Sequence, residues 1–330
     1  MKRFCVTAVC LVFALALFGE PVRAEDTRNW PSHLRLLTGP DGGQWSSMGM
    51  RINEVLSDVI LPTTSRAGGG TANLDALNKK NGEIAFTLAC FLGVAQSGEE
   101  EASSLSTENV HVLSNVYPQV LYFLVRKEFA DLHGITSVRS LLEKKAVRFA
   151  SLRPGTASEF ILSLVFKYGY GTSFEKLRDH GWNIQYTSYP EAADNLVGGD
   201  LDCFAYTAGT VVPLIQTLEQ YTDLYILPLD QDALDVLEEK FKTHTYVIAP
   251  RVYKSVTSPV RTLGDYTTLV IRKDLPDSLA HAVIKTLWER RDDIGKGNSD
   301  FVQISPKTAV PKGLTMHPGA RRFWESIGGK

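Results

Sequence analysis

Two glycine-rich loops near the start of the chain have the composition of an anion-binding site. The first reads Thr38-Gly39-Pro40-Asp41-Gly42-Gly43 and the second Ser65-Arg66-Ala67-Gly68-Gly69-Gly70-Thr71, each between an extended apolar stretch and a helical pattern. Glycine lets a backbone turn sharply with its N–H groups uncovered, and a helix beginning there adds unpaired donors and a positive dipole end. One such loop alone is more often a plain turn. Two together predict a pocket for a carboxylate or similar small anion.

Charged and aromatic side chains beside these loops are further candidates for ligand contact. Arg66 and Arg153 can each hold a carboxylate through two parallel hydrogen bonds, whereas Asp41 would repel a carboxylate and favour an amine. Asp41 followed by Gln44 also fits a capping box, and we favour that role for it. The alternative for both arginines is an exposed loop charge. Trp45 is either an aromatic wall of the cleft or part of the core, because it begins the apolar stripe of its helix.

The first 24 residues have the features of a cleavable secretory signal peptide. Lys2 and Arg3 precede an apolar run over residues 4–18, and Val22 and Ala24 provide the small residues that a signal peptidase requires. The run is shorter than the about 20 residues that a membrane span needs. We therefore expect the mature protein to be free in the periplasm.

The rest of the chain excludes several classes of protein. The formal net charge is −2, and it becomes −4 when cleavage removes three basic residues and one acidic residue, so a basic nucleic-acid surface is excluded. Cys90 and Cys203 are expected at matching places in two different lobes, and we expect no disulfide. Nucleophile-elbow, Walker and His-Glu-x-x-His motifs are missing, and the seven histidines are scattered. We expect no catalytic residues, no metal and no cofactor.

The order of elements is β-α-β-α-β, and it occurs twice. The first unit has strands at 34–37, 61–65 and 84–88, with one helix carrying apolar residues from Trp45 to Val59 and another carrying Leu74 and Leu77. The second unit has strands at 146–152, 182–186 and 201–206 and helices at 158–168 and 189–197, the first with a cap at Thr156 and Glu159. The pattern predicts two α/β lobes around a cleft at the carboxyl ends of their strands. The segments 82–86 and 199–203 resemble each other, which supports the repeat.

Long-range connections complete the predicted organisation. An extended apolar segment at 120–126 crosses from the first lobe to the second, and a strand at 266–272 with a helix around Leu279 to Leu287 belongs to the returning chain. The return crossing falls between residues 228 and 267. The last helix begins at His317-Pro318-Gly319. We therefore assign residues 25–121 to lobe 1, 122–228 to lobe 2, and 229–330 to the return segment and the second part of lobe 1.

Four segments together resemble the TAXI-type solute receptors of tripartite ATP-independent periplasmic (TRAP) transporters. They are TGPDGGQW (38–45), GGGTANL (68–74), VYP (116–118) and MHPGA (316–320), and the resemblance covers nearly the whole mature chain. It implies a type II periplasmic binding-protein fold in which two lobes close on a ligand of the glutamate or 2-oxoglutarate kind. It also implies delivery to the integral membrane permease subunits of a TRAP transporter. We expect a monomer that binds no nucleic acid.

The resemblance also implies which loops contact the ligand. Residues 155–158 and 205–209 match the ligand loops of lobe 2. The predicted ligand-binding set is Gly39, Asp41, Gly42, Gly43, Trp45, Arg66, Gly68, Gly69, Gly70, Thr71, Arg153, Thr156, Ser158, Thr207 and Gly209. This chain departs from the family pattern at Trp45 and Ser46, where tyrosines are usual, at Ala67 and Gly70, where hydroxyl residues are usual, and at Arg153, where a small residue is usual. The ligand can therefore differ from glutamate.

Two other functions fit the same sequence. A periplasmic sensor that passes its occupancy to a membrane signalling protein would use the same fold and the same cleft. A hydrolase is the remaining alternative, although none of the expected catalytic motifs is present.

Overall fold

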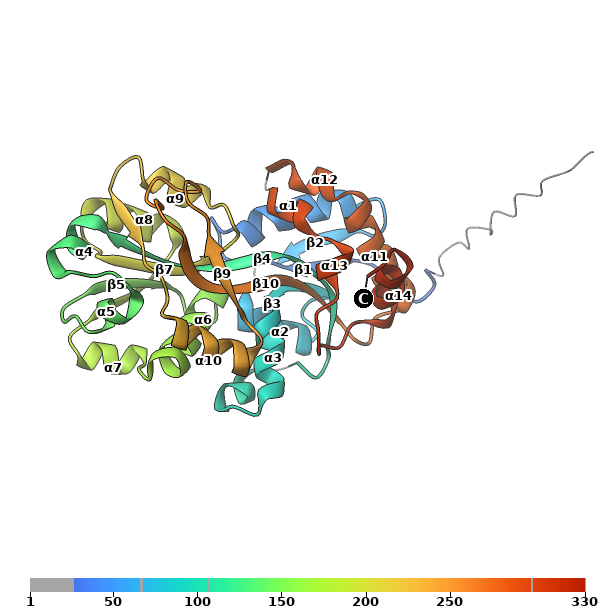
Figure 1. Ribbon diagram of the computed structural model, residues 1–330. Helices are drawn as coiled ribbons and strands as arrows, with labels where there is room; N and C mark the ends of the chain where they lie inside the picture. Colours follow the sequence, from blue (N-terminus) through green and yellow to red (C-terminus); the bar gives the residue numbers. More distant parts are fainter. Residues whose placement is uncertain (1–26, 66–67, 106, 298, 330) are drawn as a thin grey trace, which may run out of the picture.

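Two α/β lobes lie side by side and share one sheet (Figure 1). The computed structural model describes residues 27–65, 68–105, 107–297 and 299–329, so the predicted signal peptide lies outside the described residues. In this part of the chain the sheet has ten strands, eight of them in the order β2-β1-β3-β10-β4-β7-β5-β6, while β8 pairs with β4 and β9 with β10. The predicted fold class, two α/β lobes joined by crossing segments, is confirmed. None of the helices in the described ranges is both long and apolar enough for a membrane span.

Lobe 1 is built from both ends of the described chain. Its first part comprises β1 Leu34–Leu37, α1 Gln44–Leu56, β2 Pro62–Ser65, α2 Gly70–Asn78, β3 Ile84–Leu88, α3 Ala89–Ser97 and η1 Glu100–Ser104. Its second part comprises α11 Asp277–Glu289, α12 Arg291–Ile294, η3 Gly295–Gly297, η4 Ser299–Gln303, α13 Pro306–Ala309 and α14 Pro318–Ser326. Strands β1, β2 and β3 are parallel. Helix α1 buries Trp45, Met48, Ile52 and Leu56 on one face, which is the spacing that predicted it.

Lobe 2 repeats this design with a continuous stretch of chain. It contains α4 Lys127–His133, α5 Val138–Leu142, β5 Arg148–Leu152, α6 Ala157–Leu164, the π-helical turn η2 Val165–Gly169, α7 Phe174–Asp179, β6 Asn183–Thr187, α8 Tyr189–Gly198, β7 Cys203–Ala208, α9 Pro213–Leu218 and β8 Leu224–Ile226. Strands β5, β6 and β7 are parallel. The chain then forms α10 Gln231–Phe241 and β9 His244–Ile248 on its way back.

Two long strands connect the lobes through the middle of the molecule (Figure 1). Strand β4 Val110–Arg126 pairs with β10 over its first part and with β7 over its second part. Strand β10 Val260–Arg272 pairs with β9 at its start and with β3 at its end. Both strands are longer than the segments 120–126 and 266–272 that the apolar pattern predicted.

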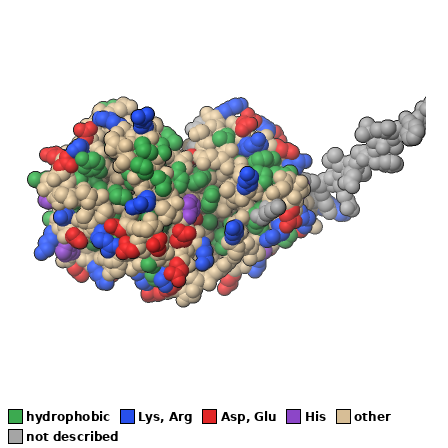
Figure 2. All heavy atoms as spheres, in the orientation of Figure 1, with side chains coloured by type: hydrophobic (Ala, Val, Ile, Leu, Met, Phe, Trp, Pro, Cys, Tyr) green, Lys and Arg blue, Asp and Glu red, His purple; other side chains and the backbone are tan. Residues whose placement is uncertain are grey.

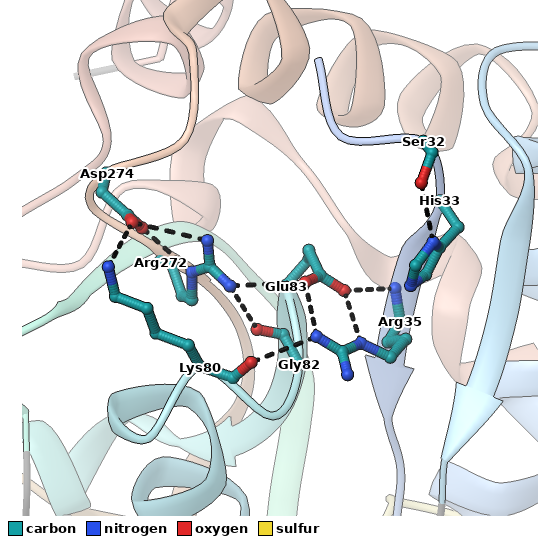
Figure 3. Close-up of polar contacts among 8 residues, drawn as sticks. All are labelled: Ser32, His33, Arg35, Lys80, Gly82, Glu83, Arg272 and Asp274. Atoms are coloured by element: carbon teal, nitrogen blue, oxygen red, sulfur yellow. Dashed lines mark hydrogen bonds and ion pairs between the residues drawn. The ribbon is translucent and has the colours of Figure 1, made fainter. Parts of the chain in front are cut away.

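One ion-pair arrangement occurs in both lobes, at the strand ends that lie away from the cleft. In lobe 1 the Arg35 backbone N–H donates to Glu83 Oε2 at 2.8 Å and its Nε to the same oxygen at 3.0 Å (Figure 3). In lobe 2 the Arg148 backbone N–H donates to Asp202 Oδ2 at 2.9 Å and its Nε at 3.0 Å. In each lobe an arginine on the first parallel strand therefore holds the carboxylate that precedes the third, β3 in lobe 1 and β7 in lobe 2.

The structural repeat corrects two details of the sequence comparison. The predicted repeat placed Glu83 opposite Asp200, but the ion pairs make Asp202 the counterpart of Glu83. The cysteines do not occupy matching places: Cys90 lies in the first turn of α3 and Cys203 begins β7, and both are buried free thiols. On the face that Figure 2 shows, basic and acidic side chains are interspersed.

Candidate functional site

A cavity of about 700 Å³ lies between the two lobes. On the lobe 1 side, the wall is formed by the first glycine loop, the start of α1, Gly69 and the η3–η4 segment. On the lobe 2 side, it is formed by the start of α6, Tyr189, the end of β7 and the loop that leads into α9. Among its lining residues are Gln44, Trp45, Met50, Gln119, Thr156, Ser158, Tyr206, Thr207, Val211, Leu214 and Lys296. The volume is within the range of small-molecule sites.

Three helices begin at this cavity. Their N-cap residues are Gly43 for α1, Gly69 for α2 and Thr156 for α6, and all three line the cavity. The Thr156 hydroxyl accepts the Glu159 N–H at 3.3 Å, whereas Gly43 and Gly69 supply no side-chain cap. Helix N-termini carry a partial positive charge and unpaired N–H donors, and both favour an anion.

The lobe 1 wall is fixed by Trp45 and Asn73. The Trp45 ring stacks on Phe86 with ring centroids 5.6 Å apart, and its indole N–H donates to Thr267 Oγ1 at 3.1 Å. Asn73 is fully buried; its amide donates to the carbonyls of Thr38 at 3.1 Å and Phe86 at 2.8 Å, and its Oδ1 accepts the Gly69 N–H at 3.2 Å. Asn73 therefore holds the two glycine loops in register with β3.

The lobe 2 wall presents a row of hydroxyl groups. Ser158 Oγ lies 3.1 Å from Thr207 Oγ1 and accepts the Thr207 N–H at 3.0 Å, which ties the start of α6 to β7. The Tyr189 and Tyr206 rings meet edge to face, with centroids 5.5 Å apart. Burial raises the pKa of both phenols, so both stay protonated and able to donate at neutral pH.

The two lobes also touch each other directly. A Cβ atom placed on Gly70 would lie 2.5 Å from the Ala157 backbone nitrogen, and Thr71 Oγ1 donates to the Gly155 carbonyl at 3.3 Å. On another side of the cavity, the Gly209 N–H donates to Gln44 Oε1 at 2.8 Å, and Gln44 Nε2 donates to Asp300 Oδ2 at 2.6 Å. The Thr210 hydroxyl donates to the other oxygen of Asp300 at 2.9 Å. The described conformation is therefore a closed one.

The structure divides the predicted ligand-binding residues into three groups. Gly39, Gly42, Gly43, Trp45, Gly69, Thr156, Ser158 and Thr207 line the cavity, and their contact with ligand stays a prediction. Gly70, Thr71 and Gly209 contact the opposite lobe instead, while Gly68, Asp41 and Arg153 are not part of the lining. Arg66 lies outside the described residues.

One role predicted for these residues is wrong, and one predicted residue lies outside the cavity lining. Gly43, not Asp41, is the N-cap of α1, so the predicted capping box of Asp41 with Gln44 is wrong, and Gln44 points its amide to Gly209 and Asp300 instead. Arg153 is exposed beside the start of α6, where its carbonyl accepts the Thr156 N–H and hydroxyl at 3.2 and 2.8 Å. Among the described residues that line the cavity, none is an arginine.

Several lining residues were missed by sequence reasoning. Gln44, Gln119, Tyr189 and Tyr206 bring amide and phenol groups to the cavity, and Met50, Val211 and Leu214 bring apolar ones. Two features of the sequence could have identified some of them. Gln119 is a polar residue within the apolar strand β4, and Tyr206 brings a hydroxyl into the apolar strand β7. No group of three or more histidine, cysteine, aspartate or glutamate side chains could hold a metal ion within the described ranges.

Comparisons with known proteins agree with this architecture. A model described as the NMT1-like family matches residues 36–328. MatC from Rhodopseudomonas palustris, solved with bound malate, has a TM-score of 0.53 at 13% identity, covering 90% of this chain and 97% of MatC. A protein from Bordetella bronchiseptica RB50 has a TM-score of 0.52 at 13% identity, covering 90% of this chain and 89% of the other. The periplasmic binding protein BugD has a TM-score of 0.48 at 14% identity, covering 81% and 88%. At such identities the likeness to the first two structures establishes the shared fold.

Proposed function

Because the chain belongs to the NMT1-like family, we propose that it is a periplasmic solute-binding receptor that captures a small carboxylate between its lobes. The observation that carries this proposal is the meeting of three helix N-termini, two from lobe 1 and one from lobe 2, at the cavity between the lobes. A carboxylate held there would contact both lobes at once, and such contacts favour the closed form. The role is binding and not catalysis.

The same proposal includes delivery to a TRAP-type membrane permease, and the resemblance to TAXI-type receptors supplies glutamate and 2-oxoglutarate as the reference acids for comparison. The two glycine loops that resemble TAXI-type receptors support this delivery, and Gly39, Gly43 and Gly69 of those loops lie at the cavity. MatC was solved with malate, another small carboxylate, on the same fold. We further propose that the protein is exported by the signal peptide at residues 1–24 and acts as a monomer.

Calorimetric titration of the mature protein tests the anion-binding proposal. The panel contains glutamate, 2-oxoglutarate, malate and several monocarboxylates. Each acid except glutamate is paired with its uncharged amide. Acids should bind and their amides should bind far more weakly, because only the acids carry the charge that helix N-termini favour. Native mass spectrometry of protein purified from its own periplasm gives a second readout, in which a co-purifying small acid supports the proposal. Equal binding of acids and amides would contradict it.

Delivery to a membrane permease has its own test. Tagged receptor, loaded or empty, is mixed with detergent-solubilised membranes from the same cells, and the captured proteins are identified. Enrichment of integral permease subunits supports delivery, whereas enrichment of a membrane signalling protein would instead favour the sensor function.

A further inference from the structure

The cavity is polar at depth and apolar at its mouth. The inner side chains Gln119, Ser158, Tyr206 and Thr207 are buried and offer amide and hydroxyl groups. Among the described residues, none hydrogen-bonds to Tyr206 Oη or to Gln119 Oε1. Buried polar atoms without a partner are costly. Of these two only the Tyr206 hydroxyl can donate to a carboxylate, because Gln119 Oε1 is an acceptor, so Tyr206 marks the polar end of the ligand.

The mouth has the opposite chemistry, and both lobes contribute to it. Met50 of α1 is 58% exposed and Val211, which precedes α9, is 43% exposed, and both line the cavity. Leu214 in the first turn of α9 also lines the cavity. When the apolar part of a ligand packs against these side chains it is removed from water. This burial strengthens binding in proportion to the apolar area that is buried.

Charge is nearly absent from the cavity wall. Among the described lining residues Lys296 is the single charged one; its exposed ammonium lies 2.6 Å from Asp293 Oδ1. A second carboxylate on the ligand would therefore meet a lysine that is already paired. No aspartate or glutamate is among the described lining residues, so an ammonium group would be buried without a counter-charge.

We propose that the receptor selects acids with a single carboxylate and an uncharged apolar body over dicarboxylates and amino acids. The inference rests on the proposed function, since it assumes that the helix N-termini hold the carboxylate. The carboxylate lies at the deep polar end and the apolar body extends toward Met50, Val211 and Leu214. A volume of about 700 Å³ leaves room for such a body.

The test compares acids that differ in one feature. The probes are 4-methyl-2-oxopentanoate, leucine with the same skeleton and an ammonium group, 2-oxoglutarate with a second carboxylate, and the uncharged 4-methyl-2-oxopentanamide, all titrated calorimetrically. We expect the first to bind at least tenfold more tightly than each of the others. In the series butanoate, hexanoate and octanoate, each buried methylene should tighten binding about fourfold.

Two kinds of failure are distinguishable. If 2-oxoglutarate, malate or leucine binds as tightly as 4-methyl-2-oxopentanoate, the selectivity is wrong while the receptor function stands. If the amide binds as tightly as its acid, or if no acid of the panel binds, the proposed carboxylate function itself is wrong.

A pair of variants locates the apolar end. Leu214→Gln should weaken binding of octanoate about tenfold and leave butanoate unchanged, because only the longer acid reaches the mouth. Val197→Gln is the matched control, since Val197 is 40% exposed on α8 and does not line the cavity. Equal losses for the two acids in Leu214→Gln, or no loss for either, would overturn the proposed orientation.

Discussion

Gln44 of lobe 1 and Gly209 of lobe 2 are joined by a hydrogen bond of 2.8 Å from the glycine N–H to the glutamine Oε1. The same glutamine donates to Asp300, a buried carboxylate whose pKa is raised by burial even though Thr210 and Gln44 donate to it. One side chain therefore connects two parts of lobe 1 to a loop of lobe 2, at the edge of the cavity.

Gln44→Ala should weaken ligand binding about tenfold. The substitution leaves the Gly209 N–H without its partner in the closed form and removes one donor from Asp300, and a buried polar group that loses its hydrogen bond costs about 1–3 kcal/mol. Calorimetry measures the affinity, and small-angle scattering with ligand measures closure. Arg51→Ala on the same helix is the control, because Arg51 is exposed and pairs with Glu54. Parental affinity in Gln44→Ala would remove this contact from the closing mechanism.

Gly70→Ala should abolish tight binding by holding the lobes apart. Its new Cβ would lie 2.5 Å from the Ala157 nitrogen and 2.8 Å from the Thr156 carbonyl carbon. Gly98 is a matched control: its φ of +75° is also left-handed, as is the +56° of Gly70, but a Cβ there would meet nothing within 4 Å. Both variants should lose about 1–2 kcal/mol from backbone strain, and only Gly70→Ala should lose ligand affinity. A parallel loss of affinity in both would show that strain alone is responsible.

Tyr206→Phe should separate stability from binding. The phenol is buried without a hydrogen-bond partner among the described residues, so its removal should leave the unliganded protein equally or more stable. Ligand affinity should fall about tenfold if the phenol donates to the carboxylate, as a hydrogen bond to a charged group contributes about 1.5–3 kcal/mol. Chemical denaturation and titration of the same sample provide the two values. Unchanged affinity would place the ligand away from Tyr206.

Asp265→Asn should make the protein less sensitive to pH. Asp265 is buried in β10, where its Oδ2 accepts the Cys90 N–H at 3.0 Å, and burial raises its pKa to about 6 from the ordinary value of 3.8. Between these values the folded state binds more protons than the unfolded state, so the free energy of unfolding falls as pH rises from about 4 to 6.

The size of this effect follows from the pKa difference. At pH 7.5 the parent should be less stable than at pH 4 by about 2 kcal/mol from this group alone, and the asparagine variant should lack that loss. The free energy of unfolding of the parent and of Asp265→Asn is measured by denaturation from pH 4 to 7.5. The difference between parent and variant at each pH isolates the contribution of Asp265 from that of other titrating groups. A difference that stays constant over this range would contradict the assignment.

Arg153→Ala should change the affinity less than twofold. Its side chain is exposed and outside the cavity lining, and the contacts of its loop to Thr156 come from its backbone carbonyl. Titration with the tightest acid of the panel is the measurement, and Arg153→Lys is the companion variant. A large loss on alanine with partial rescue by lysine would return Arg153 to the site.

Local rules predicted the elements of both lobes well. The 3.6-residue spacing gave α1, the Thr156 cap gave the start of α6, and proline after His317 gave the start of α14. The central strands were predicted too short because Ser114, Asn115 and Gln119 of β4 interrupt the apolar run, although all three are buried. Burial of polar residues depends on partners far along the chain, which a local pattern does not contain.

The candidate site was predicted only in part, for a related physical reason. Glycine loops and caps are local signals, and eight of the predicted residues line the cavity. Which glycines face the ligand and which face the other lobe depends on how α2 approaches α6, and that approach brings Gly70 against Ala157. Tyr206 and Gln119 reach the site from strands that pair across the lobes, so no nearby motif marks them.

The position of β10 between β3 and β4 has a consequence for the order of assembly. Lobe 2 takes its strands from one uninterrupted stretch, so its sheet can form as soon as that stretch is available. Strands β3 and β4 follow each other in the sequence but do not pair with each other. They are joined in the sheet only by β10, residues 260–272, which lies between them and pairs with both. Closing such distant pairings is slow. Lobe 1 is therefore completed last, and a chain truncated before β10 would keep the second lobe's sheet while leaving the first lobe open along its centre.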